Sequence, residues 1–127
     1  MTIKIPVSVG ELFDKISILE NKRFQITQAD KVKNILKELI LLRKIALKLD
    51  PKFEKDTHYK KLCKINKQLW DIEEGKRQHE RDKNFGEKFI HLARQVYMKN
   101  DERAKAKRAI NKKYGSDIVE EKSYKKY

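Results

Sequence analysis

The chain has 127 residues, of which 39% are hydrophobic and 40% are charged, and its formal net charge is +13. This length suits one domain with a real core, so we expect a single domain over residues 1–127. Four Gly and two Pro leave little room for a turn-rich β architecture, and no apolar run approaches the roughly 18 residues of a membrane-spanning helix.

The first residues predict a location for the protein, and its only cysteine restricts the chemistry. MTIKIPVSVGE contains no hydrophobic signal region and no small-residue cleavage site, which predicts a cytoplasmic protein. Cys63 is the only cysteine, so an internal disulfide and a cysteine-based metal cluster are excluded. Because Cys63 falls on the apolar face of its predicted helix, we expect a quiet core thiol rather than a nucleophile.

The positive charge raises the question of nucleic-acid binding. Lys outnumbers Arg 25 to 7, whereas specific phosphate recognition usually relies on the forked donors of Arg. The basic residues are also spread along every segment rather than gathered in one arm. Non-specific nucleic-acid binding therefore stays an alternative that the composition does not favour.

The first helix follows a short extended lead-in at residues 1–7, where hydrophobic residues alternate along TIKIPV. Ser8 is the expected N-cap, with Glu11 completing a capping box, and the helix runs to about Ile26. At about 100° per residue, its inward stripe places Arg23 where the pattern calls for leucine. Arg23 therefore needs a polar partner inside the fold or a place at its edge.

The second helix starts at Thr27 or Asp30 and ends at Leu49, before Asp50-Pro51. Its seam has the 3-4 spacing of a coiled coil: Val32, Ile35, Leu39, Leu42, Ala46 and Leu49. Further apolar residues flank the seam: Leu36, Ile40 and Leu47 on one side, Leu41 and Ile45 on the other. Such a widely apolar helix needs more than one neighbour. We expect it to be the central helix of the bundle or half of a dimer interface.

The third helix, about Thr57–Arg81, changes character along its length. Its inward face is apolar as far as Ile72 and then becomes charged: Glu73, Lys76, Arg77 and Glu80. In an up-down bundle the first and third helices run parallel, so Glu20, Arg23 and Glu38 are expected level with these charges. The layer has two interpretations. It is a structural ion-pair network, or a pocket for a small polar or anionic ligand.

The fourth helix is expected to begin after Asn84, in N-F-G-E, and to run to about Tyr114, with Gly115 as its C′ residue. Asn100 and Asp101 could cap a new helix instead. The hydrophobic pattern stays in phase across them, which favours one continuous helix.

One face of the fourth helix forms a polar ladder beside Tyr97: Asn100, Arg103, Lys107 and Asn111. The ladder either contacts a ligand or pairs with the irregular tail, residues 116–127. In the second interpretation the tail folds back, and Glu120 and Glu121 pair with Arg103 and Lys107. The sequence leaves both open.

The stretches VSVGELFDKISILENK and LWDIEEGKRQHERDKNFGEKFIHLARQVYMKNDERAKAKRAINKKYGSDIVEEKSYKKY resemble an uncharacterised family of small bacterial and phage proteins. The matching positions are Gly10, Glu11, Leu12, Asp14, Lys15, Ile18, Leu19, Glu20, Lys22, Trp70, Ile72, Glu73, Arg77, Glu80, Phe85, Gly86, Phe89, Ala93, Arg94, Tyr97, Asn100, Asp101, Arg103, Lys107, Asn111, Ser116 and Glu120 to Tyr124. The resemblance implies an association with surface-polysaccharide and sugar-transfer genes, and no known reaction. Gly75-Lys76 departs from the pattern, and Arg23 is not part of it. The stretch NDERAKAKR also resembles the all-helical chorismate mutases, over one helix only.

We therefore predict an all-α, up-down bundle of about four long helices with coiled-coil-like packing, assembled as a homodimer. The expected function is a helical accessory or interaction domain linked to polysaccharide biosynthesis, with a protein partner in sugar transfer. The alternative is an enzyme or sensor that binds a sugar phosphate or carboxylate between helices. The candidate ligand-binding residues are Glu73, Arg77, Glu80, Arg94, Tyr97, Asn100, Arg103 and Lys107. We expect no cofactor and no metal, because bundle-metal spacing is absent, and no motif identifies catalytic residues.

Overall fold

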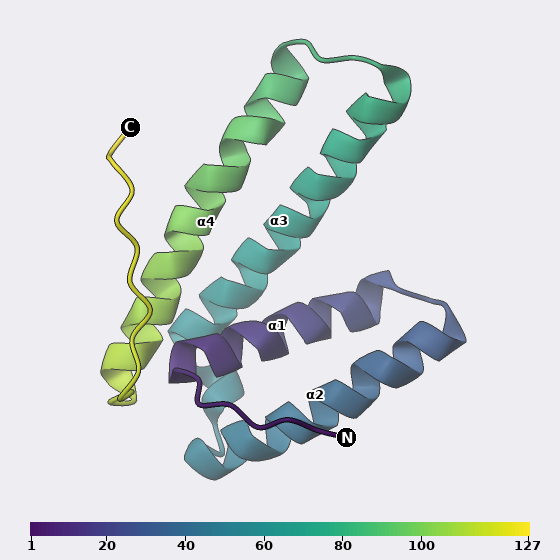
Figure 1. Ribbon diagram of the computed structural model, residues 1–127. Coiled ribbons are helices and arrows are strands. Elements are labelled where there is room, and N and C mark those ends of the chain that lie inside the picture. The colour runs from purple at the N-terminus through teal and green to yellow at the C-terminus, as the bar shows by residue number, and fades with distance from the viewer.

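The computed structural model describes residues 1–127, which form four α-helices and one short 3-10 helix, with no strand. In chain order these are α1 (Val9–Gln25), α2 (Ala29–Leu49), η1 (Phe53–Lys55), α3 (Thr57–Asp82) and α4 (Glu87–Lys113). Successive helices reverse direction (Figure 1), which confirms the predicted all-α, up-down architecture. None of the helices combines the length and hydrophobicity needed to cross a membrane.

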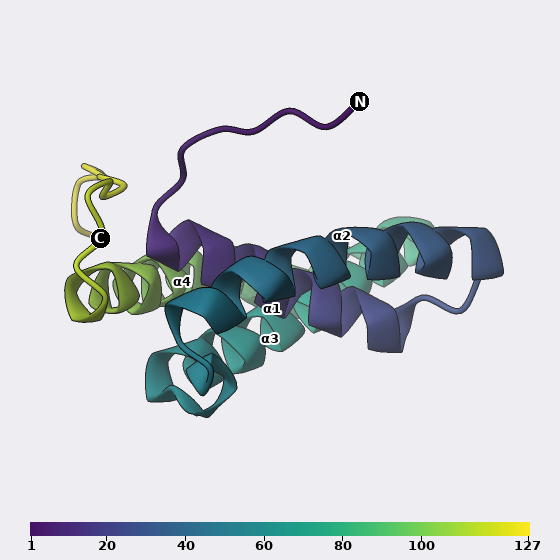
Figure 2. The ribbon, with the colours of Figure 1, turned by 90° about the horizontal axis from the view of Figure 1, so that it is seen from below.

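The helices form two hairpins that cross. The α1–α2 hairpin packs across one end of the α3–α4 hairpin, whose other end extends beyond it (Figure 1). Helix α1 lies between the other three, because it packs against α2, α3 and α4, whereas α2 packs only against α1 and η1. Residues 1–7 project away from the bundle (Figure 2).

The expectation that the second helix is central is wrong. Only Ile35, Leu39 and Ala46 of α2 are buried, and α1 occupies the centre instead. The width of its apolar face does not identify the central helix here, because the central helix α1 also buries polar residues, among them Asp14 and Ser17. A buried polar group is tolerated where it is hydrogen-bonded, and both of these are bonded, as described below.

The core lies where the two hairpins cross. Phe13 of α1 contacts Phe53 of η1 with ring centroids 5.4 Å apart, and Phe53 contacts Tyr59 of α3 at 5.2 Å. Gly10 allows α1 to approach α4 closely, since a Cβ atom there would lie 2.5 Å from the carbonyl oxygen of Lys107. Cys63 packs partly buried against this core, and burial raises the pKa of its thiol, which agrees with an unreactive cysteine.

The ends of α1 and α2 differ in how well the sequence predicts them. Ser8 caps α1 as predicted, because its hydroxyl accepts a hydrogen bond from the backbone N–H of Glu11 at 3.0 Å. The capping box is not closed, since the Glu11 carboxylate binds Lys107 on α4 instead. Helix α2 begins at Ala29 with no side-chain cap, which falls between the two predicted starts.

The ends of α3 and α4 follow local hydrogen bonding. Asp56 caps α3 by accepting from two backbone N–H groups. Gly86, rather than the expected Asn84, is the N-cap of α4, and Asn84 accepts from the Gly86 N–H as a turn residue. Helix α4 is continuous through Asn100, as predicted. Gly115 has a φ of 62°, which confirms it as the residue that ends the helix.

Candidate functional site

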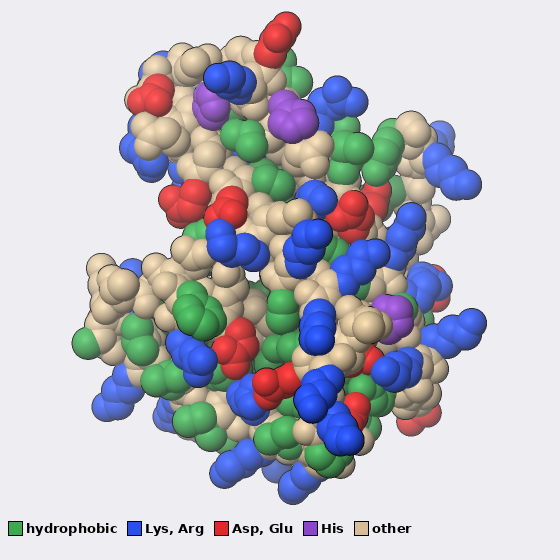
Figure 3. Space-filling model, turned by 180° about the vertical axis from the view of Figure 1, so that it is seen from behind, with side chains coloured by type: hydrophobic (Ala, Val, Ile, Leu, Met, Phe, Trp, Pro, Cys, Tyr) green, Lys and Arg blue, Asp and Glu red, His purple; other side chains and the backbone are tan.

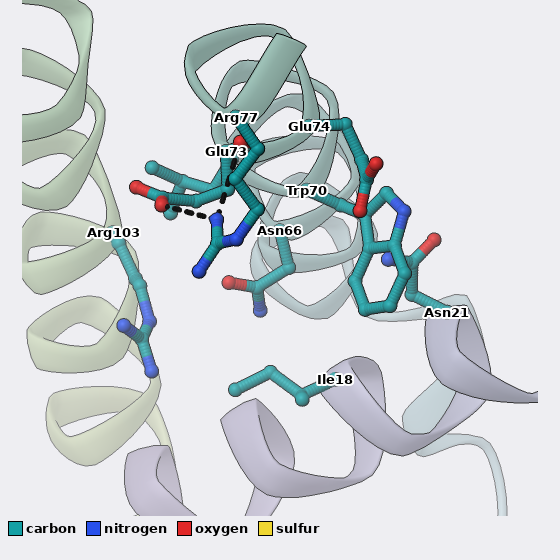
Figure 4. A pocket seen from close by; sticks show the side chains of 9 residues that line it. Ile18, Asn21, Asn66, Trp70, Glu73, Glu74, Arg77 and Arg103 are labelled. Carbon is teal, nitrogen blue, oxygen red and sulfur yellow. Dashed lines mark hydrogen bonds and ion pairs between the residues drawn. The ribbon is translucent and has the colours of Figure 1, made fainter. Parts of the chain in front are cut away.

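A pocket of about 470 Å³ opens between α1, α3 and α4. Its lining residues are Ile18, Asn21, Asn66, Leu69, Trp70, Glu73, Glu74, Arg77 and Arg103. Figure 4 shows Arg103 on α4 facing Glu73 and Arg77 on α3, with Ile18 of α1 below them. Pockets of this size are common for small-molecule ligands.

The eight candidate residues from the sequence divide into two groups. Glu73, Arg77 and Arg103 line the pocket, and Asn100 adjoins it, since its Oδ1 lies 3.5 Å from Arg103 Nη1. The other four lie elsewhere: Glu80, Arg94, Tyr97 and Lys107. Glu80 faces Lys83 at 3.6 Å, Arg94 donates to the Tyr97 hydroxyl at 3.4 Å, and Lys107 binds carboxylates of α1 and the tail.

Arg103 is held in place by the buried carboxylate of Asp14, which is one of the positions of the family resemblance but not one of the candidate site residues. Both Nε and Nη2 of Arg103 donate to Asp14, with 2.9 Å between Nε and Oδ1, and Asp14 has no exposed surface. This hydrogen bond raises the pKa of the Arg103 guanidinium above its ordinary value. The bidentate geometry fixes the guanidinium plane and directs its remaining nitrogen, Nη1, toward Asn100.

Asn66 of α3 is a residue that the sequence analysis missed. Its Nδ2 donates to Asp14 Oδ1 at 2.9 Å and to Ser17 Oγ at 2.7 Å, so both amide hydrogens are used. Its Oδ1 accepts no hydrogen bond, although the residue is only 6% exposed. No fully buried side-chain oxygen lacks a partner, so this oxygen is reached from the pocket that Asn66 lines. It is an unused acceptor on the pocket wall.

Glu73 and Arg77 form an ion pair one turn apart on α3. Arg77 Nη1 donates to Glu73 Oε2 at 2.9 Å, and Lys76 lies 3.3 Å from the same carboxylate. Burial raises the pKa of Glu73, but the hydrogen bonds from Arg77 and Lys76 outweigh it and leave the pKa below its ordinary value. Glu73 is therefore charged at neutral pH. Nε and Nη2 of Arg77 have no protein acceptor.

The polar ladder on α4 binds α1 and the tail, as one of the two interpretations expected. Lys107 Nζ lies 2.7 Å from both Glu11 and Glu120. Burial lowers the pKa of Lys107, but these two hydrogen bonds outweigh it and raise the pKa. Glu121 pairs with Arg108 instead, and Arg103 pairs with Asp14, so the expected pairing of Arg103 with the tail is wrong. Asn111 completes the ladder by accepting from the Gly10 N–H.

The expected layer that joins Arg23 and Glu38 to Glu73 does not form. Arg23 lies 3.5 Å from Glu20 within α1, with its side chain 45% exposed, and Glu20 also faces Arg43 of α2 at 3.4 Å. Glu38 is exposed. The reason is the crossing of the two hairpins, which directs the C-terminal end of α1 away from α3 (Figure 1). Arg23 is exposed at the edge of the core, although Ile26, the next residue of the stripe, still packs against the core.

One sequence family matches the chain, and it is described as a family of unknown function (DUF6165), with residues 3–127 matched. No curated protein and no solved structure matches. The geometry of the site is therefore the main guide to its chemistry.

Proposed function

Since the chain belongs to this family of unknown function, we propose from its site that it is an accessory domain that binds a small hydroxylated anion, such as a sugar phosphate or a sugar carboxylate. The ligand would occupy the pocket between α1, α3 and α4. The observation that carries the proposal is that Arg77 and Arg103 face one cavity together with the unused acceptor of Asn66.

The lining offers each part of such a ligand a matching group. Arg77 has two free nitrogens for a phosphate or carboxylate, and guanidinium groups are the preferred partners of both. Asn66 Oδ1 and the Glu74 carboxylate are acceptors, so they suit hydroxyl donors. The face of Trp70 suits the C–H side of a sugar ring, because one side of such a ring is apolar.

The charge balance limits how negative the ligand is. Asp14 neutralises Arg103, Glu73 neutralises Arg77, and Glu74 adds a further negative charge. These five groups sum to a charge of −1, so a strongly anionic ligand would meet no net positive potential here, whereas a ligand with one acidic group and several hydroxyls gains hydrogen bonds to both kinds of lining group. This favours a ligand with one acidic group over a diphosphate.

We further propose that this binding serves polysaccharide biosynthesis, with a protein partner in sugar transfer. Support comes from the resemblance of the two terminal stretches, which implies association with such genes. In this proposal the domain presents or senses a sugar intermediate and leaves the transfer itself to its partner.

Ligand binding can be tested by calorimetry with glucose 1-phosphate, glucuronate, glucose and inorganic phosphate as probes. We expect the first two to bind better than the last two, and Arg77→Met to weaken their binding by about tenfold or more. Arg81→Met is the matched control, because Arg81 lies on the same helix, is exposed and bonds only Gln78. If none of the four probes binds, or if both variants behave alike, the proposal is wrong.

Non-specific nucleic-acid binding remains the alternative for the basic surface. Figure 3 shows Lys and Arg side chains spread over one whole face among acidic and hydrophobic ones, rather than lining one groove. Such binding would weaken with salt, with a slope of log K against log salt of about −0.9 for each phosphate contacted. Salt-insensitive binding of a sugar phosphate would support the pocket instead.

A further inference from the structure

Helix α2 has an exposed stripe that no part of the chain covers. Five residues on it, which we call the outer stripe, follow a strict 4-3-4-3 spacing: Asn34, Glu38, Leu41, Ile45 and Lys48. All five are exposed, with Leu41 at 49% and Ile45 at 54%. At about 100° per residue they share one side of the helix, and this spacing is that of a coiled-coil seam.

Four residues of the outer stripe, from Glu38 to Lys48, are complementary to their own reverse order. Two aliphatic residues occupy the middle, with an acid toward the N-terminal end and a base toward the C-terminal end. Two copies of α2 in antiparallel contact, related by a two-fold axis between Leu41 and Ile45, would place Leu41 against Ile45 of the other copy. The same symmetry would place Glu38 against Lys48. Antiparallel coiled coils pair their two seam positions in this alternating way.

We propose that the outer stripe of α2 is a docking surface for a second copy of this chain, packed antiparallel. Neither Glu38 nor Lys48 forms an ion pair within the chain, so both are available to the second copy. The two symmetry-related Glu38–Lys48 pairs would flank a centre of four aliphatic side chains. Opposite charges in this position fix register and direction as well as adding affinity.

The other flank of α2 is less suited to a second copy than the outer stripe is. That flank contains the half-buried Leu36 and the exposed Ile40 and Leu47, with Ile40 at 55% exposure. Lys44 lies between Ile40 and Leu47 in the sequence, and Arg43 beside it is paired with Glu20 and Glu54 within the chain. Two copies meeting along this flank would find no acid there for Lys44, whereas the outer stripe supplies Glu38 for Lys48. Only the outer stripe is complementary to itself.

The contact spans about three helical turns, which makes a small interface, so a weak dimer is expected. Sedimentation equilibrium of the full chain, from about 1 μM to 1 mM, measures it. We expect a monomer–dimer equilibrium in the wild type. Glu38→Lys and Lys48→Glu should each weaken association by about tenfold or more, because each change creates two like-charge contacts per dimer. The double reversal should restore association to within about threefold of the wild type.

Two hydrophobic variants separate the two flanks of α2. Ile45→Asp should abolish dimerisation, whereas Ile40→Asp, an equally exposed isoleucine on the other flank, should leave it unchanged. Circular dichroism melts check that all variants are folded. A wild type that is monomeric throughout, two single reversals without effect, or a double reversal that fails to restore association would each overturn the proposal. Binding of the outer stripe to vesicles of anionic lipid in place of self-association would also overturn it.

Discussion

The carboxylate of Asp14 joins three helices through its hydrogen bonds. It lies on α1, accepts two hydrogen bonds from Arg103 of α4 and one from Asn66 of α3, and has no contact with solvent. An ionised carboxylate in this setting is stable only while its partners remain. The same contacts orient Arg103 and Asn66 toward the pocket, so one buried charge both joins the helices and arranges the candidate site.

Replacement of Arg103 tests this role of Asp14. We expect Arg103→Met to lower the free energy of unfolding, because it leaves the Asp14 charge buried and unpaired. Breaking a buried ion pair costs roughly 3–5 kcal/mol, and we expect about 3 kcal/mol here because Arg103 is partly exposed. The double variant Asp14→Leu/Arg103→Met should recover part of that loss. Urea denaturation of the two variants measures the difference. An Arg103→Met protein as stable as the wild type would show that Asp14 does not depend on this partner.

At the scale of elements, α1 occupies the central position that the wide apolar face of α2 suggested for α2. Helix α1 packs against α2, α3 and α4, and it contributes both apolar core residues and the polar contacts of Asp14 with α3 and α4. Helix α2 needs only a narrow buried edge, which leaves its flanks free. The exposed aliphatic residues of α2 therefore lie outside the core.

Two substitutions on α2 distinguish its buried edge from its free flank. Leu39 is 1% exposed, so Leu39→Ala should cost about 2–5 kcal/mol of unfolding free energy, as core truncations do. Ile40→Ala, at the next position but 55% exposed, should change it by about 0.5 kcal/mol or less. Thermal or urea melts at low protein concentration compare the two. Equal losses for both would mean that α2 is covered on both faces.

At the scale of the whole molecule, the C-terminal tail, residues 116–127, contacts the start of α1 and the side of α4. Ser116 Oγ accepts from the Val9 N–H at 3.2 Å, Glu120 binds Lys107, and Tyr127 meets Tyr97 edge to face with 5.2 Å between ring centroids. The tail thus runs back along α4 (Figure 1). The first two contacts are part-buried and the third joins two exposed rings, so the tail is held less firmly than the core and is more sensitive to solution conditions.

The docking of the tail should depend on pH. The hydrogen bond from Lys107 lowers the pKa of Glu120 below its ordinary value. A carboxyl with a lowered pKa adds stability above its unfolded pKa, near 4, and loses it as pH falls through the folded pKa. We expect residues 118–124 to be ordered at neutral pH and released on acidification, as measured by heteronuclear NOE. Glu120→Gln should release them at neutral pH, whereas Glu121→Gln, whose pair with Arg108 is exposed, should have less effect.

The sequence by itself determined the features that depend on neighbours along the chain. The four helices, the Ser8 cap, the continuity of α4 through Asn100 and the Gly115 terminus all follow from hydrophobic period and local hydrogen bonding, which act over a few residues. It also marked Glu73, Arg77 and Arg103 as unusual, because charges on an inward face are rare.

Only the tertiary structure decided how the hairpins meet. Their crossing, which depends on side chains far apart in sequence, placed α1 rather than α2 at the centre and left Arg23 at the edge of the core. It also brought Asp14 and Asn66, 52 residues apart, within 2.9 Å and turned the Asn66 oxygen toward the pocket. No periodicity could predict these contacts, because polar burial depends on partners supplied by other helices.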